Sequence, residues 1–344
     1  MLEKKPLFNE QGERDAQRRR MIHGHPTNLI ELNNVKYAWA YRLYRTMMQN
    51  FWIPEEISLT HDALQYEQLT EAERTAYDRV LSFVIFMDSL QVHNLPNISA
   101  VITAPEVNLV LAVQDFQEAV HAQSYAYIVD SVVPQARRDA IYNLWRDDPL
   151  LLTRNRLITD QYQQFVVQPT EENLVHTLMA NFLLEGLYFY SGFAFFYGLG
   201  RRGKMGGTVS IIQYINRDER IHLVLFQNIL RELFREEPQL FTPEMQENLR
   251  QMAAAAVEHE TTWSAHVLGE GIAGLTAETV AAYVRYLAND RLHRLGLSPL
   301  FPQQMEHPLP WLTRFANLNE QKVDFFEQRV LNYAKASGPQ WGEL

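Results

Sequence analysis

Two Glu-x-x-His pairs are the residues of this sequence whose types and spacing best suit chemistry. Glu118 and His121 are three positions apart, and so are Glu219 and His222. On a helix, residues at this spacing lie on one face, with about 5–6 Å between their Cβ atoms. Tyr125 follows one turn after His121, so a carboxylate, an imidazole and a phenol line a single seam. Two such pairs on two helices form half of a dinuclear metal site.

Two more carboxylates, Asp88 and Glu185, stand within apolar stretches with helical periodicity. A single buried carboxylate is most simply a polar group with a hydrogen-bond partner. Four carboxylates in one core are different, because they repel one another and are costly to desolvate unless positive charge compensates them. No lysine or arginine lies on the same helix faces. The sequence therefore predicts two metal ions held by Asp88, Glu118, His121, Glu185, Glu219 and His222.

The donor set also restricts the metals. Oxygen-rich ligation with one imidazole per ion suits iron or manganese better than zinc, and carboxylates can bridge two ions. Phe189 and Phe193 follow Glu185 by four and eight positions, and Ile215 precedes Glu219 by four. Each of these apolar residues shares a ligand's stripe, so we expect them to wall the site, to pack the core, or both.

Composition excludes several classes of protein. The chain has 344 residues, 47% of them hydrophobic, and a formal net charge of -10, with no dense basic run. These features predict a folded protein that does not bind nucleic acid. No apolar run is long enough for a membrane span, and the N-terminus lacks the apolar core of a signal peptide. We therefore expect a cytoplasmic protein.

Helical periodicity extends over most of the chain, and no strand or hairpin pattern is present, so the predicted fold class is all-α. Residues 1–30 look like a mobile, solvated arm, residues 31–335 like one helical domain, and residues 336–344 like a flexible tail. Asn94–Asn97 is expected to turn the chain, and a loop is expected before the capping box of Thr70 and Glu73. The expected helices cover residues 34–53, 70–93, 105–133, 135–145, 150–166, 170–199, 243–268, 276–290 and 317–334, and a further helix after Gly206-Gly207 bears Glu219 and His222.

Six sequence motifs resemble, in content and order, those of the small, radical-generating subunit of class I ribonucleotide reductase. They are FWIPEEI, FMDSLQVHNLPNI, QEAVHAQSY, FLLEGLYFYSGFAFF, RRGKMGGT and RDERIH, and the resemblance runs from about Tyr37 to about His222. It implies a ferritin-like helical bundle with additional helices, usually a homodimer, whose dimetal centre reacts with dioxygen. Iron is the metal expected in both positions, with a manganese–iron or dimanganese pair as the alternatives.

The resemblance also implies roles for single residues. Asp88, Glu118 and His121 match the ligands of the first metal, and Glu185, Glu219 and His222 match those of the second. Tyr125 stands at the position of the family's radical tyrosine. Its alternative is an ordinary core tyrosine, because some branches of the family lack a radical there.

Trp52 and Asp218 match the residues that connect the site with the surface. Asp218 points roughly 100° round the helix from Glu219, which suits an acceptor for the ring N–H of His121. For Trp52 the alternative is a packing anchor at a helix end. Tyr333 resembles the family's relay tyrosine, and the terminal SGPQWGEL resembles its docking peptide, with a frayed terminus as the alternative.

The sequence contains no cysteine. Reduction of a ribonucleotide needs redox thiols, so this chain is expected to pass its oxidant to a separate, cysteine-bearing large subunit. The predicted function is that of the small subunit of ribonucleoside-diphosphate reductase, which supplies deoxyribonucleotides for DNA replication. Two alternatives use the same scaffold. One is a ligand-binding dimetal oxidase, against which Asp88 counts, because that group typically has glutamate there. The other is a metal-storage bundle, which would not need Tyr125, Trp52 and Asp218.

Overall fold

The computed structural model describes residues 1–272 and 274–316, and every regular element among them is helical. The β-type pairings within this part of the chain are two isolated bridges, Glu13 with Pro26 and Ile272 with Leu275. The prediction of an all-α fold is confirmed. The α-helices are α1 (Ala38–Gln49), α2 (Thr60–Gln68), α3 (Glu71–Val101), α4 (Pro105–Val132), α5 (Gln135–Asp147), α6 (Pro149–Val167), α7 (Glu171–Leu183), α8 (Phe189–Arg201), α9 (Gly206–Glu236), α10 (Pro243–Leu268), α11 (Ala277–Arg294) and α12 (Trp311–Phe315).

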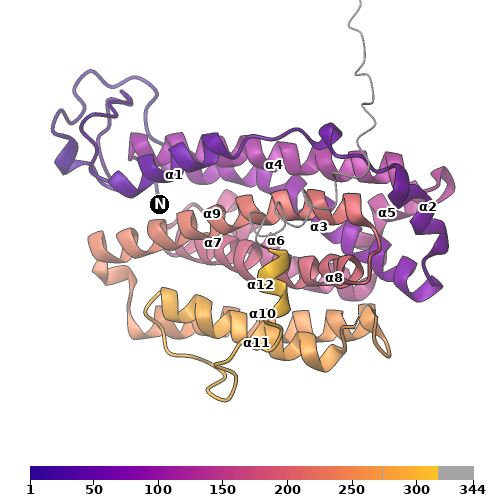
Figure 1. Ribbon diagram of the computed structural model, residues 1–344. Helices are drawn as coiled ribbons and strands as arrows, with labels where there is room; N and C mark the ends of the chain where they lie inside the picture. Colours follow the sequence, from indigo (N-terminus) through magenta and orange to yellow (C-terminus); the bar gives the residue numbers. More distant parts are fainter. Residues whose placement is uncertain (273, 317–344) are drawn as a thin grey trace, which may run out of the picture.

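Short turns complete the element order. They are the 3-10 turns η1 (Ala16–Arg18), η2 (Pro54–Glu56) and η4 (Pro238–Leu240) and the π-helical turn η3 (Leu184–Tyr188). The central bundle consists of α3, α4, α9 and the continuous helix α7–η3–α8, which pack against one another. In Figure 1, α1 lies beside α4 on one side of this bundle, and α10 and α11 lie on the other. The architecture is the predicted ferritin-like bundle with additional helices.

Local sequence signals set the starts of the two helices that open the bundle. The Thr70 side chain accepts a hydrogen bond from the Glu73 amide, while the Glu73 carboxylate accepts one from the Thr70 amide. This reciprocal capping box satisfies two N–H groups that the first turn leaves without partners. At α4, Pro105 occupies the first helical position and Glu106 adds negative charge to the first turn. Both starts agree with the predictions.

The predicted turn at Asn94–Asn97 is wrong, because α3 continues through Pro96 to Val101. A proline inside a helix removes one backbone hydrogen bond and costs about 3 kcal/mol. Pro96 is exposed, whereas its neighbours Leu95 and Ile98 are fully buried. Burial of these two side chains offsets the cost, since each contributes about 1.5–3 kcal/mol.

The region predicted as a loop before Thr70 contains the short helix α2. Its position is stabilised by a tertiary contact that local patterns do not show. Asp62 of α2 is buried, and its carboxylate accepts hydrogen bonds from the amides of Gly207 (2.9 Å) and Thr208 (2.6 Å). Asp62 therefore caps the N-terminus of α9, where its negative charge also interacts favourably with the positive end of the helix dipole.

The segment 1–30 lies against the helices, so the prediction of a solvated arm is wrong for its second half. Met21 and Ile22 are buried, and the Met21 amide donates to Glu236 Oε2 at 2.8 Å. Glu236 Oε1 accepts from Lys36 Nζ and from the Tyr37 hydroxyl, both at 2.6 Å. We call residues 19–37 the N-terminal strap. Apolar burial and charge-assisted hydrogen bonds together hold it against α9.

One helix among the described residues, Glu171–Arg201, is long and apolar enough to cross a bilayer. Its most apolar window is 89% buried inside the protein, as expected for a core helix. The predicted helix over 317–334, Tyr333 and the tail of residues 336–344 lie outside the described residues.

Candidate metal centre

The six predicted metal ligands come together in the middle of the central bundle. Asp88 belongs to α3, Glu118 and His121 to α4, Glu185 to η3, and Glu219 and His222 to α9. All six side chains are completely buried. Their potential ligand atoms form two groups, and within each group all atoms lie within 4.8 Å of one another. The groups are Asp88, Glu118, His121 and Glu219 in the first half-site, and Glu118, Glu185, Glu219 and His222 in the second.

Two carboxylates belong to both half-sites. In the first, His121 Nδ1 lies 3.4 Å from Glu118 Oε2 and 3.1 Å from Glu219 Oε1. In the second, His222 Nδ1 lies 3.2 Å from Glu118 Oε1 and 2.9 Å from Glu219 Oε2. Each of these carboxylates thus sends one oxygen to each half-site. The resemblance divides the ligands into two separate sets of three, but in the structure Glu118 and Glu219 belong to both half-sites. These two carboxylates are therefore placed so that they could bridge two metal ions.

The remaining ligands are terminal. Asp88 Oδ2 lies 3.7 Å from His121 Nδ1, and Glu185 Oε2 lies 3.7 Å from His222 Nδ1. Several of these buried atoms have no hydrogen-bond partner among the described residues, namely both oxygens of Asp88, Glu118 Oε2, Glu185 Oε2, Glu219 Oε1 and both ring nitrogens of His121. Buried polar atoms without partners are rare in folded proteins. A cluster of them converging on two points fits a pair of metal ions with mixed oxygen and nitrogen ligation.

Burial and the charges of the carboxylates hold protons on this cluster. Burial raises the pKa of Asp88 well above its usual value, and the charges of Glu118 and Glu219 add to the effect. Burial raises the pKa of Glu185 in the same way. For His121 and His222, burial lowers the pKa, but the surrounding carboxylates outweigh it and raise the pKa well above its ordinary value. Without metal, the cluster therefore carries protons at neutral pH.

Metal binding should consequently release protons, and the apparent affinity should fall as the pH is lowered. The raised pKa values of these four groups all favour proton release, because each group holds a proton that a cation must displace. Titration calorimetry with Mn²⁺ at pH 7, in two buffers of different ionisation enthalpy, measures the number released. We expect a net release and a rising affinity between pH 6 and pH 8. A heat that is independent of the buffer would contradict this protonation state.

The π-helical turn η3 brings Glu185 to the cluster. The Phe189 amide donates to the Leu184 carbonyl, one residue farther than in an α-helix. Such a turn leaves carbonyls that need other donors, and two buried arginines supply them. Arg291 Nε donates to the Gly186 carbonyl at 2.9 Å, and an Arg154 amino group lies 3.5 Å from the Tyr188 carbonyl.

Replacing Gly186 by alanine should disturb this turn. A Cβ atom at position 186 would lie 2.5 Å from Leu223 Cδ1 and 2.8 Å from Arg291 Nε. Overpacking of this kind costs typically about 1–3 kcal/mol, and here it acts beside Glu185. We expect a lower free energy of unfolding in urea and fewer than two metal ions bound per chain.

Gly192→Ala is the matched control in the same helix. Its Cβ would meet Val80 Cγ1 at 3.4 Å, an ordinary contact, and alanine has a higher helix propensity than glycine. Gly192→Ala should keep both metal ions. Equal behaviour of the two variants would show that the close contacts at Gly186 are unimportant.

Tyr125 lies one turn after His121 and is fully buried. Its hydroxyl faces the Asp88 carboxylate, which can accept a hydrogen bond from it. Burial raises the pKa of Tyr125 well above its ordinary value, and the charges of Asp88 and Glu219 raise it further. The phenol is therefore neutral and borders the first half-site.

The structure places Trp52 and Asp218 in a line with His121. Trp52 is 8% exposed, and its indole N–H donates to Asp218 Oδ2 at 3.0 Å. The same oxygen lies 3.5 Å from His121 Nε2. Trp52 also stacks on Tyr214, with 5.1 Å between ring centroids. An uninterrupted chain of polar contacts therefore leads from the first half-site to the edge of the bundle.

Phe189, Phe193 and Ile215 are also buried. The rings of Phe189 and Phe193 stack with 6.0 Å between their centroids, and the ring centroids of Phe189 and Phe83 are 5.7 Å apart. That these side chains shield Tyr125 stays a prediction.

Sequence reasoning missed three buried glutamines that contact the ligands. Gln91 and Gln114 donate to Glu185, and the oxygen of Gln117 lies 3.0 Å from His222 Nε2. A usable signal was present, because Gln91 follows Asp88 by three positions and Gln114 precedes Glu118 by four. A polar amide on the apolar stripe of a ligand indicates a side chain that orients that ligand.

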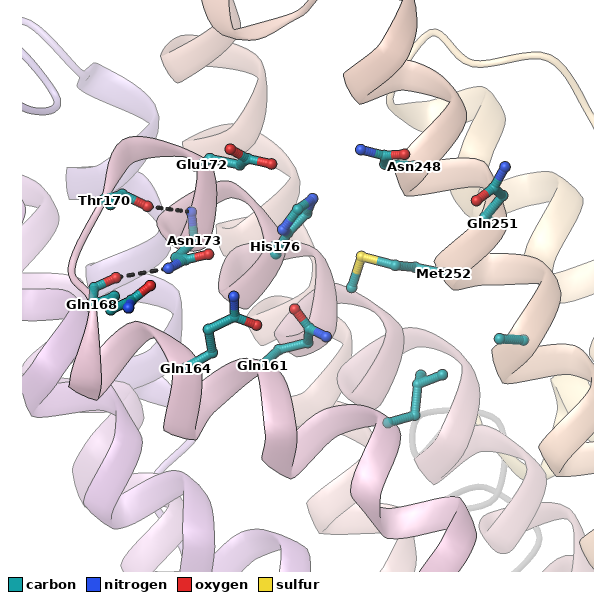
Figure 2. Close-up of a pocket in the computed structure, with 12 residues that line it drawn as sticks. Gln161, Gln164, Gln168, Thr170, Glu172, Asn173, His176, Asn248, Gln251 and Met252 are labelled. Atoms are coloured by element: carbon teal, nitrogen blue, oxygen red, sulfur yellow. Dashed lines mark hydrogen bonds between the residues drawn. The ribbon is translucent and has the colours of Figure 1, made fainter.

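A large hollow elsewhere on the protein contains none of these ligands. It has a volume of about 590 Å³ and lies among α6, α7 and α10. Figure 2 shows the amides Gln161, Gln164 and Asn173 on one side and Asn248 and Gln251 on the other. The metal centre is instead a filled region of the core, so the chemistry of its side chains, not the size of a cavity, indicates it.

The chain is similar to several known proteins. The chain matches the family described as "Ribonucleotide reductase, small chain" over residues 29–308. It is 47% identical over 340 residues to the ribonucleoside-diphosphate reductase subunit beta of Treponema pallidum (strain Nichols), covering 98% of this chain and 97% of that protein.

Solved structures are similar as well. The ribonucleotide reductase R2 subunit from Clostridium botulinum superposes with a TM-score of 0.90 at 50% identity, over 92% of this chain and 100% of that one. The Streptococcus sanguinis dimanganese(II)-NrdF gives a TM-score of 0.73 over 84% of this chain and 99% of that one. Its identity is 22%, so this likeness concerns the fold alone.

Proposed function

The chain belongs to the family of ribonucleotide reductase small chains, and from that premise we propose that its buried centre generates a one-electron oxidant stored on Tyr125 as a tyrosyl radical. The protein is a ribonucleotide reductase small subunit. The observation that supports the finer proposal is the position of Tyr125. It is a neutral, fully buried phenol that faces the Asp88 carboxylate, beside a cluster of unpaired ligand atoms.

Asp88, Glu118, His121, Glu185, Glu219 and His222 would hold the two metal ions. When bound, these ions supply the oxidising power for which dioxygen is the proposed source. We propose iron in both positions, with a manganese–iron or dimanganese pair as alternatives, and the Streptococcus sanguinis protein is named as a dimanganese form. The carboxylate-rich donor set suits either element.

The protein's own residues would govern the tyrosine. Oxidation of Tyr125 would pass one electron to the bound metal ions and the phenolic proton to the carboxylate of Asp88, whose charge affects this phenol most. Burial excludes water and external reductants, which would otherwise quench the radical. Phe189, Phe193 and Ile215 are the apolar residues we propose as its shield.

Trp52 and Asp218 are proposed to carry the oxidising equivalent outward. The direct hydrogen bond between them and the contact of Asp218 with His121 support this route. Tyr333 is proposed as the next relay, on sequence grounds alone, and the segment 336–344 as the docking peptide.

The oxidising equivalent is proposed to pass to a cysteine-bearing large subunit, because this chain has no cysteine with which to reduce a ribonucleotide. Its substrates are proposed to be ribonucleoside diphosphates, as the names of the relatives state for those proteins. We place both subunits in the cytoplasm.

A homodimer is the proposed assembly. Phe116 on α4 is 50% exposed and stacks on Phe51, which is 62% exposed, with 6.3 Å between centroids. Ala112 and Ala119 extend this exposed apolar face along α4. An apolar patch of this kind marks an interface, and a second copy of the chain would cover it. Sedimentation velocity of the purified protein distinguishes a dimer from a monomer.

Aerobic metal loading followed by addition of the large subunit tests the proposal. We expect a tyrosyl signal in electron paramagnetic resonance and nucleotide reduction that requires the added subunit. A metal-loaded protein that forms no one-electron oxidant would overturn the proposal. Oxidation of a small apolar substrate without the large subunit would favour the oxidase alternative.

A further inference from the structure

Two buried glutamines bind one oxygen of Glu185. Gln91 Nε2 donates to Glu185 Oε1 at 2.6 Å, and Gln114 Nε2 donates to the same oxygen at 3.1 Å. Both glutamines are completely buried. The other oxygen, Oε2, has no hydrogen-bond partner and lies 3.7 Å from His222 Nδ1. One oxygen of this carboxylate is therefore engaged by amides, and the other faces the second half-site.

The amides are themselves held in place. The hydroxyl of Tyr162, which lies on α6 and is 3% exposed, donates to Gln91 Oε1 at 2.9 Å. This bond fixes the direction of the amide, because it leaves Gln91 Nε2 pointing at Glu185. Gln114 Nε2 also lies 3.1 Å from Glu118 Oε1 and thus spans a terminal and a bridging carboxylate. The contacts join α3, α4, α6 and η3 around one carboxylate.

The first half-site lacks such a restriction. Asp88 corresponds there to Glu185, but neither Gln91 nor Gln114 donates to it, and the side chain that it faces is the phenol of Tyr125. Asp88 can therefore offer two oxygens to a metal ion, whereas Glu185 can offer one. With one nitrogen and two bridging oxygens in each half-site, the protein supplies at most about five donors to the first ion and about four to the second. Octahedral coordination, which manganese adopts with oxygen ligands, would leave more open positions on the second ion.

We propose that Gln91 and Gln114 are positioning residues that restrict Glu185 to one ligating oxygen, and so keep a coordination position of the second half-site open for a small exogenous ligand. This inference rests on the proposed dimetal function. Without the two N–H donors, Glu185 Oε1 would be free to rotate onto the metal and occupy that position. The ligand class is a small anion or diatomic molecule, because the site is enclosed in the bundle core.

The test uses cobalt-loaded protein and azide. Co²⁺ reports its coordination number through the intensity of its visible absorption, and azide binding to an open position changes that spectrum. Gln91→Met/Gln114→Met removes both donors at nearly constant side-chain volume. We expect the unsubstituted protein and this variant to bind two Co²⁺ per chain, but the variant to bind azide at least about 10-fold more weakly, the usual scale for residues that orient metal ligands.

Gln213→Met is the matched control, since Gln213 is a buried glutamine on α9 that donates to the Phe315 carbonyl at 2.8 Å and belongs to neither half-site. It should keep the azide response. Tyr162→Phe is the milder variant if the double substitution does not fold, because it frees the Gln91 amide without altering either glutamine, and it should weaken azide binding in the same direction. Unchanged azide affinity in the double variant would overturn the inference. If the double variant does not fold, unchanged azide affinity in Tyr162→Phe would overturn it. Absence of any azide response in the unsubstituted protein would do the same.

These outcomes are separate from those of the proposed function. Cobalt loading requires neither dioxygen chemistry nor the large subunit, so the inference can fail while the tyrosyl signal and nucleotide reduction persist. Conversely, an azide response that depends on Gln91 and Gln114 would stand even if Tyr125 held no radical.

Discussion

Tyr125→Phe should abolish the tyrosyl signal after aerobic metal loading and leave two metal ions bound per chain. Phenylalanine fills nearly the same volume but has no O–H bond to oxidise. The lost hydroxyl faces the Asp88 carboxylate, so the free energy of unfolding should change by about 1 kcal/mol, the net contribution of one hydrogen bond. Nucleotide reduction with the large subunit should fall by at least about three orders of magnitude, as expected when an essential reacting group is removed.

A second buried tyrosine provides the control for this experiment. Tyr188 is also completely buried, and its hydroxyl has no hydrogen-bond partner in the described part of the chain. Its charged neighbours are Glu260 and Arg154 instead of the ligand cluster. Tyr188→Phe should keep both the signal and the activity. A tyrosyl signal that survives in Tyr125→Phe would place the radical on another residue.

Trp52→Phe should separate radical formation from radical use. Phenylalanine can still stack on Tyr214, but it cannot donate a hydrogen bond to Asp218. We expect a normal tyrosyl signal in the isolated subunit and a loss of nucleotide reduction of up to about 100-fold, the scale reported for partners that orient metal ligands. Steady-state assays with the large subunit and spectra of the isolated protein measure the two quantities independently.

Trp39→Phe is the corresponding control, because Trp39 is a partly buried indole whose N–H has no partner within the described residues. It should leave both quantities unchanged. If Trp52→Phe also prevented radical formation, Trp52 would act in assembling the centre instead of in the outward route.

The sequence indicated which six side chains converge, because each is a charged residue on an otherwise apolar stripe. Helical spacing of Glu118 and His121 survives unchanged in the structure, since α4 is regular there. The sharing of Glu118 and Glu219 between two half-sites depends on how four helices pack, and no spacing within one helix contains that information. The roles of single residues come from the resemblance to a known family.

The errors have physical causes of the same kind. Pro96 carries a strong local signal for a turn, but burial of Leu95 and Ile98 outweighs it. Helix α2 is short, and Asp62 is bound to the start of α9, far away in sequence. The π-helical turn at Glu185 follows from packing against two arginines that lie outside its own helix. In each case a tertiary contact overrides the local pattern.

The N-terminal strap has a consequence for the order of folding. Its hydrogen bonds to Glu236 join residues separated by 199 to 215 positions. Contacts between such distant positions form slowly, because a long loop must close first, and their acceptor on α9 is synthesised long after the strap. The strap is therefore expected to close last, over a bundle that has already assembled. Pulsed hydrogen exchange at the Met21 amide would detect this as protection that develops after that of the central helices.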